Sequence, residues 1–204
     1  MIHRGDWGQI VLLGDVFDLW AAPFHKIARM HAAVLAVLEA AECTVTYVPG
    51  NHDDAFRGLS YLNSFQTVWP YYRFSSGGKW VVAAHGDTYD EFEGVPSRFG
   101  AWASRLADRV ARWFAGPGVS ITRSFRYSYA ERGPGRSSYV APIHSKAAAD
   151  LDGDIVLIGH THVPTTREEH GEKILVNTGD FGPEHMTYVV VEDGRAELRS
   201  IDPS

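Results

Sequence analysis

The sequence contains a single cysteine, Cys43, among its 204 residues. With no second cysteine the chain can form neither an internal disulfide nor a Cys₄ zinc site, so its composition suits a reducing cytosol. No apolar run approaches the roughly 20 residues that cross a bilayer, and no apolar segment follows Arg4 as it would in a signal peptide. These absences predict a cytoplasmic protein.

Positive charge is also scarce, because 19 Lys and Arg residues stand against 25 Asp and Glu residues, a formal net charge of −6. Nucleic-acid binders usually need a basic surface to neutralise phosphates, so this balance argues against a general nucleic-acid partner. An apolar share of 45% is ordinary for a globular chain that buries one core. We therefore expect one domain over residues 1–204.

The first half of the chain has the pattern of a parallel βαβ unit. Apolar and β-branched runs at 10–13 and 44–48 are typical of buried strands. Between them, residues 25–41 repeat apolar side chains at three- and four-residue steps, which predicts a helix. That order predicts an α/β fold with parallel strands. Further strands are expected at 80–84, 155–158, 173–177, 187–191 and 196–201, the last two joined by an Asp-Gly turn.

Residues 94–150 differ from the rest in charge. They hold nine of the 19 basic residues and three of the 25 acids, about +6 by that count. A helix is expected over 96–115, with aromatic side chains along one stripe and arginines beside it. We expect an inserted basic cap whose candidate contacts to an anionic substrate are Arg98, Arg105, Arg109, Arg112 and His144. The alternative is a solvated face whose arginine stems cover apolar surface.

Four of the apolar runs end directly in side chains that can bind metals. These are Gly14-Asp15, Gly50-Asn51-His52-Asp53, His85-Gly86-Asp87 and Gly159-His160-Thr161-His162. The carboxyl ends of strands in open α/β sheets form the crevice where ligands bind. Each string alone is common turn chemistry, whereas four together predict a metal centre.

The residue types suggest a role for each candidate. Asp15 offers the charged oxygen that can bridge two cations, and Asn51 offers a neutral carbonyl oxygen. Three imidazoles suited to Mn²⁺, Fe²⁺ or Zn²⁺ come from His85, His160 and His162. His52 would then face the substrate, as a proton donor or a stabilising cation.

These motifs resemble those of the calcineurin-like metallophosphoesterase superfamily, over essentially the whole chain. The segments Gly14 to Trp20, His85-Gly86-Asp87, Gly159 to Pro164 and Asn177 to Asp180 are similar to its UDP-2,3-diacylglucosamine hydrolase branch. The resemblance implies a sandwich of two β-sheets flanked by helices, with a helical cap inserted between the second and third of these segments. It also implies two divalent metal ions, usually Mn²⁺, and attack of a bridging hydroxide on phosphorus.

The resemblance further implies a role for each matching residue. Asp15 corresponds to the bridging ligand, and Asn51, His85 and His160 to ligands of one metal. His162 corresponds to a ligand of the other metal, and His52 to the superfamily's catalytic histidine. The hydrolase branch can have arginine at the position of His52, a departure that bears on the substrate assignment more than on the chemistry.

One superfamily motif, an Asp-x-His on a first strand, is not found among the thirteen residues before Gly14. His3 and Asp6 are the candidates there, and neither follows a strand pattern. Two explanations are open, namely a sequence that begins inside a longer protein or a divergent member with one complete metal site. We favour the first, because a missing strand would leave a parallel sheet with an unpaired edge.

The leading functional hypothesis is a phosphoesterase that cleaves a phosphoester or pyrophosphate bond. A phosphorylated small molecule or a UDP-diacylglucosamine-like nucleotide-lipid is the expected substrate, and the cap leaves open a peripheral contact with the membrane. The alternative hypothesis is a truncated or divergent metal-binding protein with little or no turnover.

Overall fold

The first sheet contains the βαβ unit expected from the sequence. In the computed structural model, which describes residues 7–20, 22–62, 65–90, 136–181 and 186–201, β1 (Gln9–Leu13) pairs in parallel with β2 (Thr44–Val48). Two short strands, β3 (Tyr61–Leu62) and β4 (Phe65–Thr67), complete the order β1-β2-β4-β3. Among the described strands, β1 therefore lies at the edge of its sheet.

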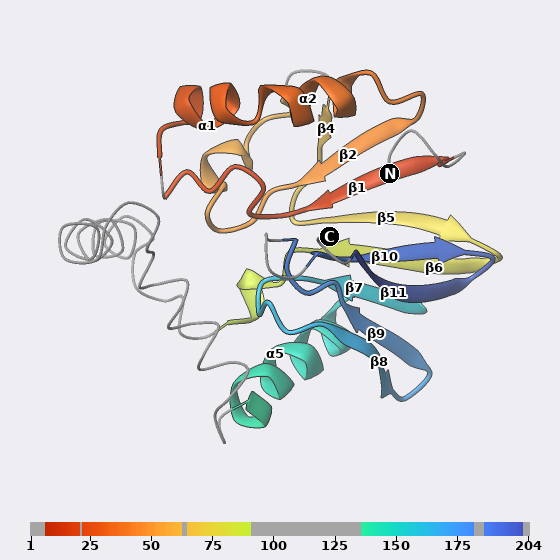
Figure 1. The fold of residues 1–204 in the computed structure, drawn as a ribbon. Coiled ribbons are helices and arrows are strands. Elements are labelled where there is room, and N and C mark those ends of the chain that lie inside the picture. Colours follow the sequence, from red (N-terminus) through yellow and green to blue (C-terminus); the bar gives the residue numbers. More distant parts are fainter. Residues whose placement is uncertain (1–6, 21, 63–64, 91–135, 182–185, 202–204) are drawn as a thin grey trace.

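Two helices connect β1 to β2 where the sequence predicts one. These are α1 (Phe24–Met30) and α2 (Ala32–Glu39). They separate at His31, whose φ of −108° and ψ of 19° lie outside the helical region. Figure 1 shows both helices on the outer side of the first sheet, where Ile27 and Leu38 pack against Val45 and Tyr47.

The second sheet has five strands in the order β5-β6-β7-β9-β8. Their bounds are β5 (Tyr71–Ser76), β6 (Lys79–Ala84), β7 (Ile155–Ile158), β8 (Thr165–His170) and β9 (Lys173–Asn177). The three central strands β6, β7 and β9 are parallel to one another. Every residue of β7 is buried, as expected for a parallel strand covered on both faces.

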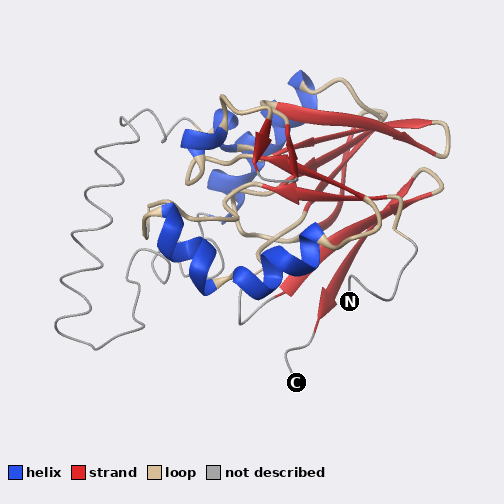
Figure 2. Ribbon diagram, turned by 90° about the horizontal axis from the view of Figure 1, so that it is seen from above, coloured by secondary structure: helices blue, strands red, loops and turns tan. Residues whose placement is uncertain are grey.

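Each face of this second sheet packs against a different layer. One face contacts helix α5 (Arg136–Asp150) through Ala147 and Ala148. The other face contacts β1 and the hairpin of β10 (Met186–Glu192) and β11 (Arg195–Ile201), whose inward side chains include Val189 and Leu198. The layers can be followed from above in Figure 2.

Some of the elements expected from the sequence are confirmed by the structure, and others lie outside the described residues. The α/β class and the hairpin are confirmed, with Asp193 and Gly194 at φ of +48° and +70°, as a two-residue Asp-Gly turn requires. The helix expected over 96–115 and the four arginines of the cap lie outside the described residues. Within the predicted cap, α5 packs on the second sheet. None of the described helices is long and apolar enough to cross a membrane.

Candidate metal centre

Three of the predicted ligands meet where β1, β2 and β6 end. Nε2 of His85 lies 3.2 Å from a carboxylate oxygen of Asp15 and 3.2 Å from the side-chain amide oxygen, Oδ1, of Asn51. His85 and Asn51 are only 4% and 3% exposed, so the contact is made in the interior. The structure thus brings together an anionic oxygen, a neutral oxygen and an imidazole from turns far apart in the sequence.

The ring of His85 is oriented by a backbone acceptor. Its Nδ1 lies 3.2 Å from the carbonyl oxygen of Leu13, which can only accept a hydrogen bond, so this nitrogen carries a proton in the neutral and in the charged ring. Nε2 is thereby directed at Asp15 and Asn51. Metal-binding histidines commonly have one nitrogen bonded to a backbone carbonyl in this way, which leaves the other free for the metal.

His160 shows the same division of roles between its two nitrogens. Its Nε2 donates to a carboxylate oxygen of Asp90 at 3.0 Å. Burial lowers the pKa of His160, which favours the neutral ring with its lone pair on Nδ1. Within the described residues this buried Nδ1 has no hydrogen-bond partner. The ring packs edge-on against His85, with 5.3 Å between centroids. An uncompensated polar atom here is costly unless it binds a ligand.

Two glycines make room for the donor atoms. A Cβ at Gly50 would overlap Oδ1 of Asp15 and come within 2.7 Å of Nε2 of His85. A Cβ at Gly14 would overlap the His85 ring from the other side, and Gly14 also has a φ of +75°. The turns after β1 and β2 can therefore approach His85 only because both positions lack a side chain.

Backbone strain is concentrated at the predicted ligands. Asp15, His160 and His162 have φ of +53°, +62° and +56°, in the left-handed region that residues other than glycine rarely adopt. Such conformations cost of order 1–3 kcal/mol each and persist where the surroundings enforce them, often at functional sites. The strain supports the assignment of two turns, the one that carries Asp15 and the one that carries His160 and His162, to a functional site.

His52 lies beside the cluster with its ring fixed by two neighbours. Its Nδ1 is 2.7 Å from a carboxylate oxygen of Asp18, and its ring stacks on Trp20 with centroids 4.0 Å apart. Its backbone N–H donates to Asp15 at 2.9 Å. The sequence analysis did not assign roles to Asp18 and Trp20, although both lie within the quoted motif.

Asp53 is a further residue that the sequence analysis left without a role. It is fully buried and accepts hydrogen bonds from the backbone N–H groups of Val16 and Phe17, at 2.8 and 3.1 Å. Burial raises the pKa of Asp53 to about 6. The carboxylate therefore holds the turn that carries Asp15 against the turn that carries Asn51.

The remaining predicted residues lie apart from this cluster. His162 is 40% exposed, and its Nδ1 lies 3.7 Å from a carboxylate oxygen of Asp180. His144, expected as a substrate contact, is fully buried and has both ring nitrogens next to protein partners, Glu168 and Asn177. This position differs from the expected one, because α5 packs on the second sheet and turns His144 inward.

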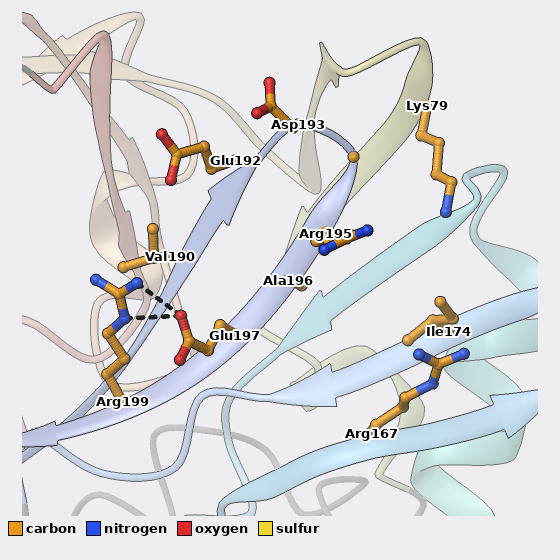
Figure 3. A pocket seen from close by; sticks show the side chains of 11 residues that line it. Lys79, Arg167, Ile174, Val190, Glu192, Asp193, Arg195, Ala196, Glu197 and Arg199 are labelled. Atoms are coloured by element: carbon orange, nitrogen blue, oxygen red, sulfur yellow. Dashed lines mark hydrogen bonds and ion pairs between the residues drawn. The ribbon is translucent and has the colours of Figure 1, made fainter.

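A groove of about 760 Å³ lies elsewhere, along the β10–β11 hairpin (Figure 3), and none of the predicted site residues lines it. Four basic and three acidic side chains line this groove, and Arg199 is already paired with Glu197 at 2.6 Å. The mixture of charges does not favour a single class of ligand, so the cluster around His85 is the better candidate site.

A family model described as calcineurin-like phosphoesterase matches residues 4–164. The chain belongs to the calcineurin-like phosphoesterase family. The α/β fold expected for this family is thereby confirmed. The branch that acts on UDP-2,3-diacylglucosamine is not distinguished by this match.

Other comparisons concern the fold alone. No curated protein matches the sequence significantly. Vacuolar protein sorting 29 (Vps29) from Cryptosporidium parvum is 14% identical with a TM-score of 0.40, over 96% of this chain and 98% of that one. A single mutant of Vps29 from Entamoeba histolytica is 13% identical with a TM-score of 0.41, over 98% and 85%. A conserved protein described as a predicted phosphoesterase, from Streptococcus pneumoniae TIGR4, is 12% identical with a TM-score of 0.34, over 95% and 97%.

Divalent metals are typical of calcineurin-like phosphoesterases, and the donor set fits them in chemistry. Carboxylate, amide oxygen and imidazole together suit Mn²⁺, Fe²⁺ or Zn²⁺. As they stand, no three His, Cys, Asp or Glu side chains of the described residues are spaced to hold a cation. The donor atoms of His85, Asp15 and Asn51 contact one another directly. A cation must therefore displace the contact between His85 and Asp15.

This competition predicts that metal affinity rises with pH. Burial disfavours the imidazolium of His85, but the Asp15 carboxylate outweighs it and raises the pKa of His85 to about 9. Below that pH a cation must displace one proton from Nε2, so we expect Mn²⁺ affinity to increase about tenfold per pH unit. Isothermal titration calorimetry between pH 6.5 and 8.5 measures this slope. A His85→Gln variant has no such proton and should lose the slope, and a flat profile in the unsubstituted protein would contradict the prediction.

Proposed function

We propose that this member of the calcineurin-like phosphoesterase family hydrolyses a phosphoester or pyrophosphate bond in a metal-dependent reaction. The observation that carries the proposal is the convergence of Asp15, Asn51 and His85, beside the Nδ1 of His160, which has no hydrogen-bond partner in the part of the chain that the structure describes. The family match supports metal-dependent phosphoester hydrolysis in general. In the proposed reaction an activated water attacks the phosphorus atom of the substrate.

The residues that would hold the metals are the predicted ones. Asp15, Asn51, His85 and His160 would hold one cation, and Asp15 and His162 a second, with Mn²⁺ as the expected ion. A bound divalent cation supplies Lewis-acid stabilisation of charge on the phosphoryl group and activates water as a nucleophile. Asp53 and the two glycines hold the turns at the close approach that this ligand set requires.

His52 is the candidate general acid. The Asp18 carboxylate accepts a hydrogen bond from Nδ1–H, so Nε2 is the nitrogen that can give a proton to the leaving oxygen. Stacking on Trp20 limits rotation of the ring, which reduces the entropy lost when the proton is delivered. The same ring, when protonated, would stabilise negative charge on the phosphoryl oxygens.

For the substrate we propose a nucleotide-linked lipid such as a UDP-diacylglucosamine. This part rests on the motifs shared with the hydrolase branch and on the basic, aromatic segment 94–150 of the sequence. Arg98, Arg105, Arg109 and Arg112 would bind the diphosphate. Such a substrate would place the protein in the cytoplasm, in peripheral contact with a membrane.

A second candidate function is metal binding without turnover. Its support is that Asp15, Asn51 and His85 contact one another, whereas His162 is directed toward Asp180. Metal content separates the two functions, because two equivalents of Mn²⁺ per chain agree with the enzyme and one equivalent agrees with binding alone.

The assay for the proposed enzyme is Mn²⁺-dependent hydrolysis of bis(p-nitrophenyl) phosphate, with a chelator as the metal-free control. In that assay we expect His52→Asn to lower kcat by about 100-fold or more, since removing one group that stabilises charge on the phosphoryl oxygens costs about 10²–10³-fold. Metal content should be unchanged, because the backbone N–H that donates to Asp15 is retained.

An exposed histidine on α1, His25, provides the matched control, and His25→Asn should keep full activity. Asp18→Asn should also lower kcat while leaving metal content unchanged, because the amide no longer fixes the proton on Nδ1. Unimpaired turnover in His52→Asn would remove His52 from the mechanism.

A further inference from the structure

Two chains of hydrogen bonds run from helix α5 to the turn Gly159-His160-Thr161-His162. In the first, the hydroxyl of Tyr139 donates to Oδ2 of Asp90 at 2.7 Å. The same carboxylate oxygen accepts from Nε2 of His160 at 3.0 Å. Asp90 and His160 are 5% and 1% exposed, so this chain lies in the interior.

The second chain reaches the backbone of the same turn. Nδ1 of His144 donates to Glu168 at 2.8 Å, and its Nε2 lies 3.2 Å from the side-chain amide nitrogen of Asn177. That amide nitrogen also lies 3.0 Å from the carbonyl oxygen of Gly159 and 2.9 Å from the hydroxyl of Thr161. His144 and Asn177 are both fully buried.

The turn needs such support, because its conformation is costly. His160 and His162 both lie in the left-handed region, at φ of +62° and +56°. Burying a polar network is also costly unless each member is satisfied. A fold that needed only packing between α5 and the second sheet could use apolar side chains, as it does at Ala147 and Ala148. The polar chains therefore point to a requirement for precise placement of the turn.

We propose that Tyr139 and His144 are positioning residues that hold His160 ready to bind a metal. Through Asp90, Tyr139 keeps the proton of His160 on Nε2 and its lone pair on Nδ1. Through Asn177, His144 holds the backbone on either side of His160. The inference rests on the proposed function to the extent that His160 is a metal ligand, and it assigns α5 a part in building the centre.

The first arm of the test compares Tyr139 with Tyr89. The hydroxyl of each donates to an aspartate, and each of these hydrogen bonds joins α5 to the segment that follows β6. Tyr139→Phe removes the hydroxyl that bonds Asp90. Tyr89→Phe removes one that donates to Asp150, at the end of α5, at 2.8 Å. We expect Tyr139→Phe to weaken Mn²⁺ binding by about 10-fold or more, as loss of an outer-shell partner does, and Tyr89→Phe to leave it unchanged. Equal affinities in the two variants would overturn the proposal.

The second arm uses a conservative replacement to separate hydrogen bonding from packing. His144→Ala should weaken Mn²⁺ binding by about 10-fold or more. His144→Gln, whose side-chain oxygen can accept from Asn177, should restore most of that loss. If the glutamine variant folds and binds Mn²⁺ no better than the alanine variant, the hydrogen-bonded chain through Asn177 is not what positions the turn.

A third readout needs neither metal nor turnover. The ¹⁵N shifts of the His160 ring in the metal-free protein report which nitrogen carries the proton. We expect the Nε2–H form in the unsubstituted protein and a larger share of the Nδ1–H form in Tyr139→Phe. An unchanged tautomer in that variant would overturn the role given to Tyr139. A protein that shows these effects and yet hydrolyses no phosphodiester would support the positioning proposal and reject the proposed enzymatic function.

Discussion

Replacing Asp15 with alanine is expected to lower kcat by about 10³-fold and to remove bound metal. Asp15 would be the only anionic ligand in the assembled cluster, and it contacts both Nε2 of His85 and the backbone N–H of His52. Metal ions stabilise transition-state charge by several kcal/mol, and each 1.36 kcal/mol corresponds to tenfold in rate. Losing the cation therefore removes about three powers of ten from the rate.

The control for Asp15→Ala is the same substitution at Asp152. Asp152 is 92% exposed and lies 3.4 Å from Arg73, so its removal should change neither metal content nor turnover. Both variants are measured by metal analysis and by hydrolysis of the chromogenic diester, with circular dichroism to confirm folding. Full metal content and full kcat in folded Asp15→Ala would show that the predicted centre is not the reactive one.

The predicted ligands could be found from the sequence because each follows a recognisable strand. The runs before Asp15 and Asn51 are β1 and β2, whose parallel pairing brings their carboxyl ends to one edge of the first sheet. The run before His85 is β6 of the second sheet, which packs against β1. Position relative to a strand end is a local property, so one sequence is enough to detect it. The strain at Asp15 and His160 is not local in this sense, and only the structure reveals it.

The supporting residues could not be found in the same way. Asp90 and Asp18 are single acids in loops, and their value depends on a partner that lies far away in sequence or on the other side of a turn. No periodicity marks such residues. The edge strand β8 was missed for a related reason, since Thr165 to His170 is polar throughout and resembles a loop.

His144 shows how the residues next to a side chain in the sequence can suggest exposure to the substrate when the side chain is buried. A histidine at the end of a basic segment suggests contact with phosphate. The small apolar residues that follow it, Ala147 and Ala148, pack on the second sheet and turn this part of α5 inward. No helix is predicted from the sequence over this segment, so the sequence could not show which face of the second sheet these residues contact.

Gly50→Ala is expected to lower kcat/KM by about 100-fold while the fold is retained. The added Cβ would overlap Oδ1 of Asp15 and approach Nε2 of His85 to 2.7 Å, so it displaces the donor atoms themselves. Misplacing reactive groups by about 1 Å can cost about 10²-fold. Gly50 is not among the positive-φ glycines, so alanine brings no backbone strain. The stability cost should stay near the roughly 1–3 kcal/mol typical of overpacking.

Gly58→Ala is the matched control, because no atom of the other described residues, its two chain neighbours aside, lies within 4 Å of a Cβ at Gly58, and its φ is not positive. There we expect unchanged activity and a stability gain of about 0.4–1 kcal/mol, since alanine reduces the entropy of the unfolded chain. Chemical denaturation and Mn²⁺ titration of both variants separate the effect on the centre from the effect on the fold. If Gly50→Ala binds Mn²⁺ as tightly as Gly58→Ala, the donor atoms of Asp15 and His85 must be able to take other positions. The close approach of the two turns would then not be what assembles the centre.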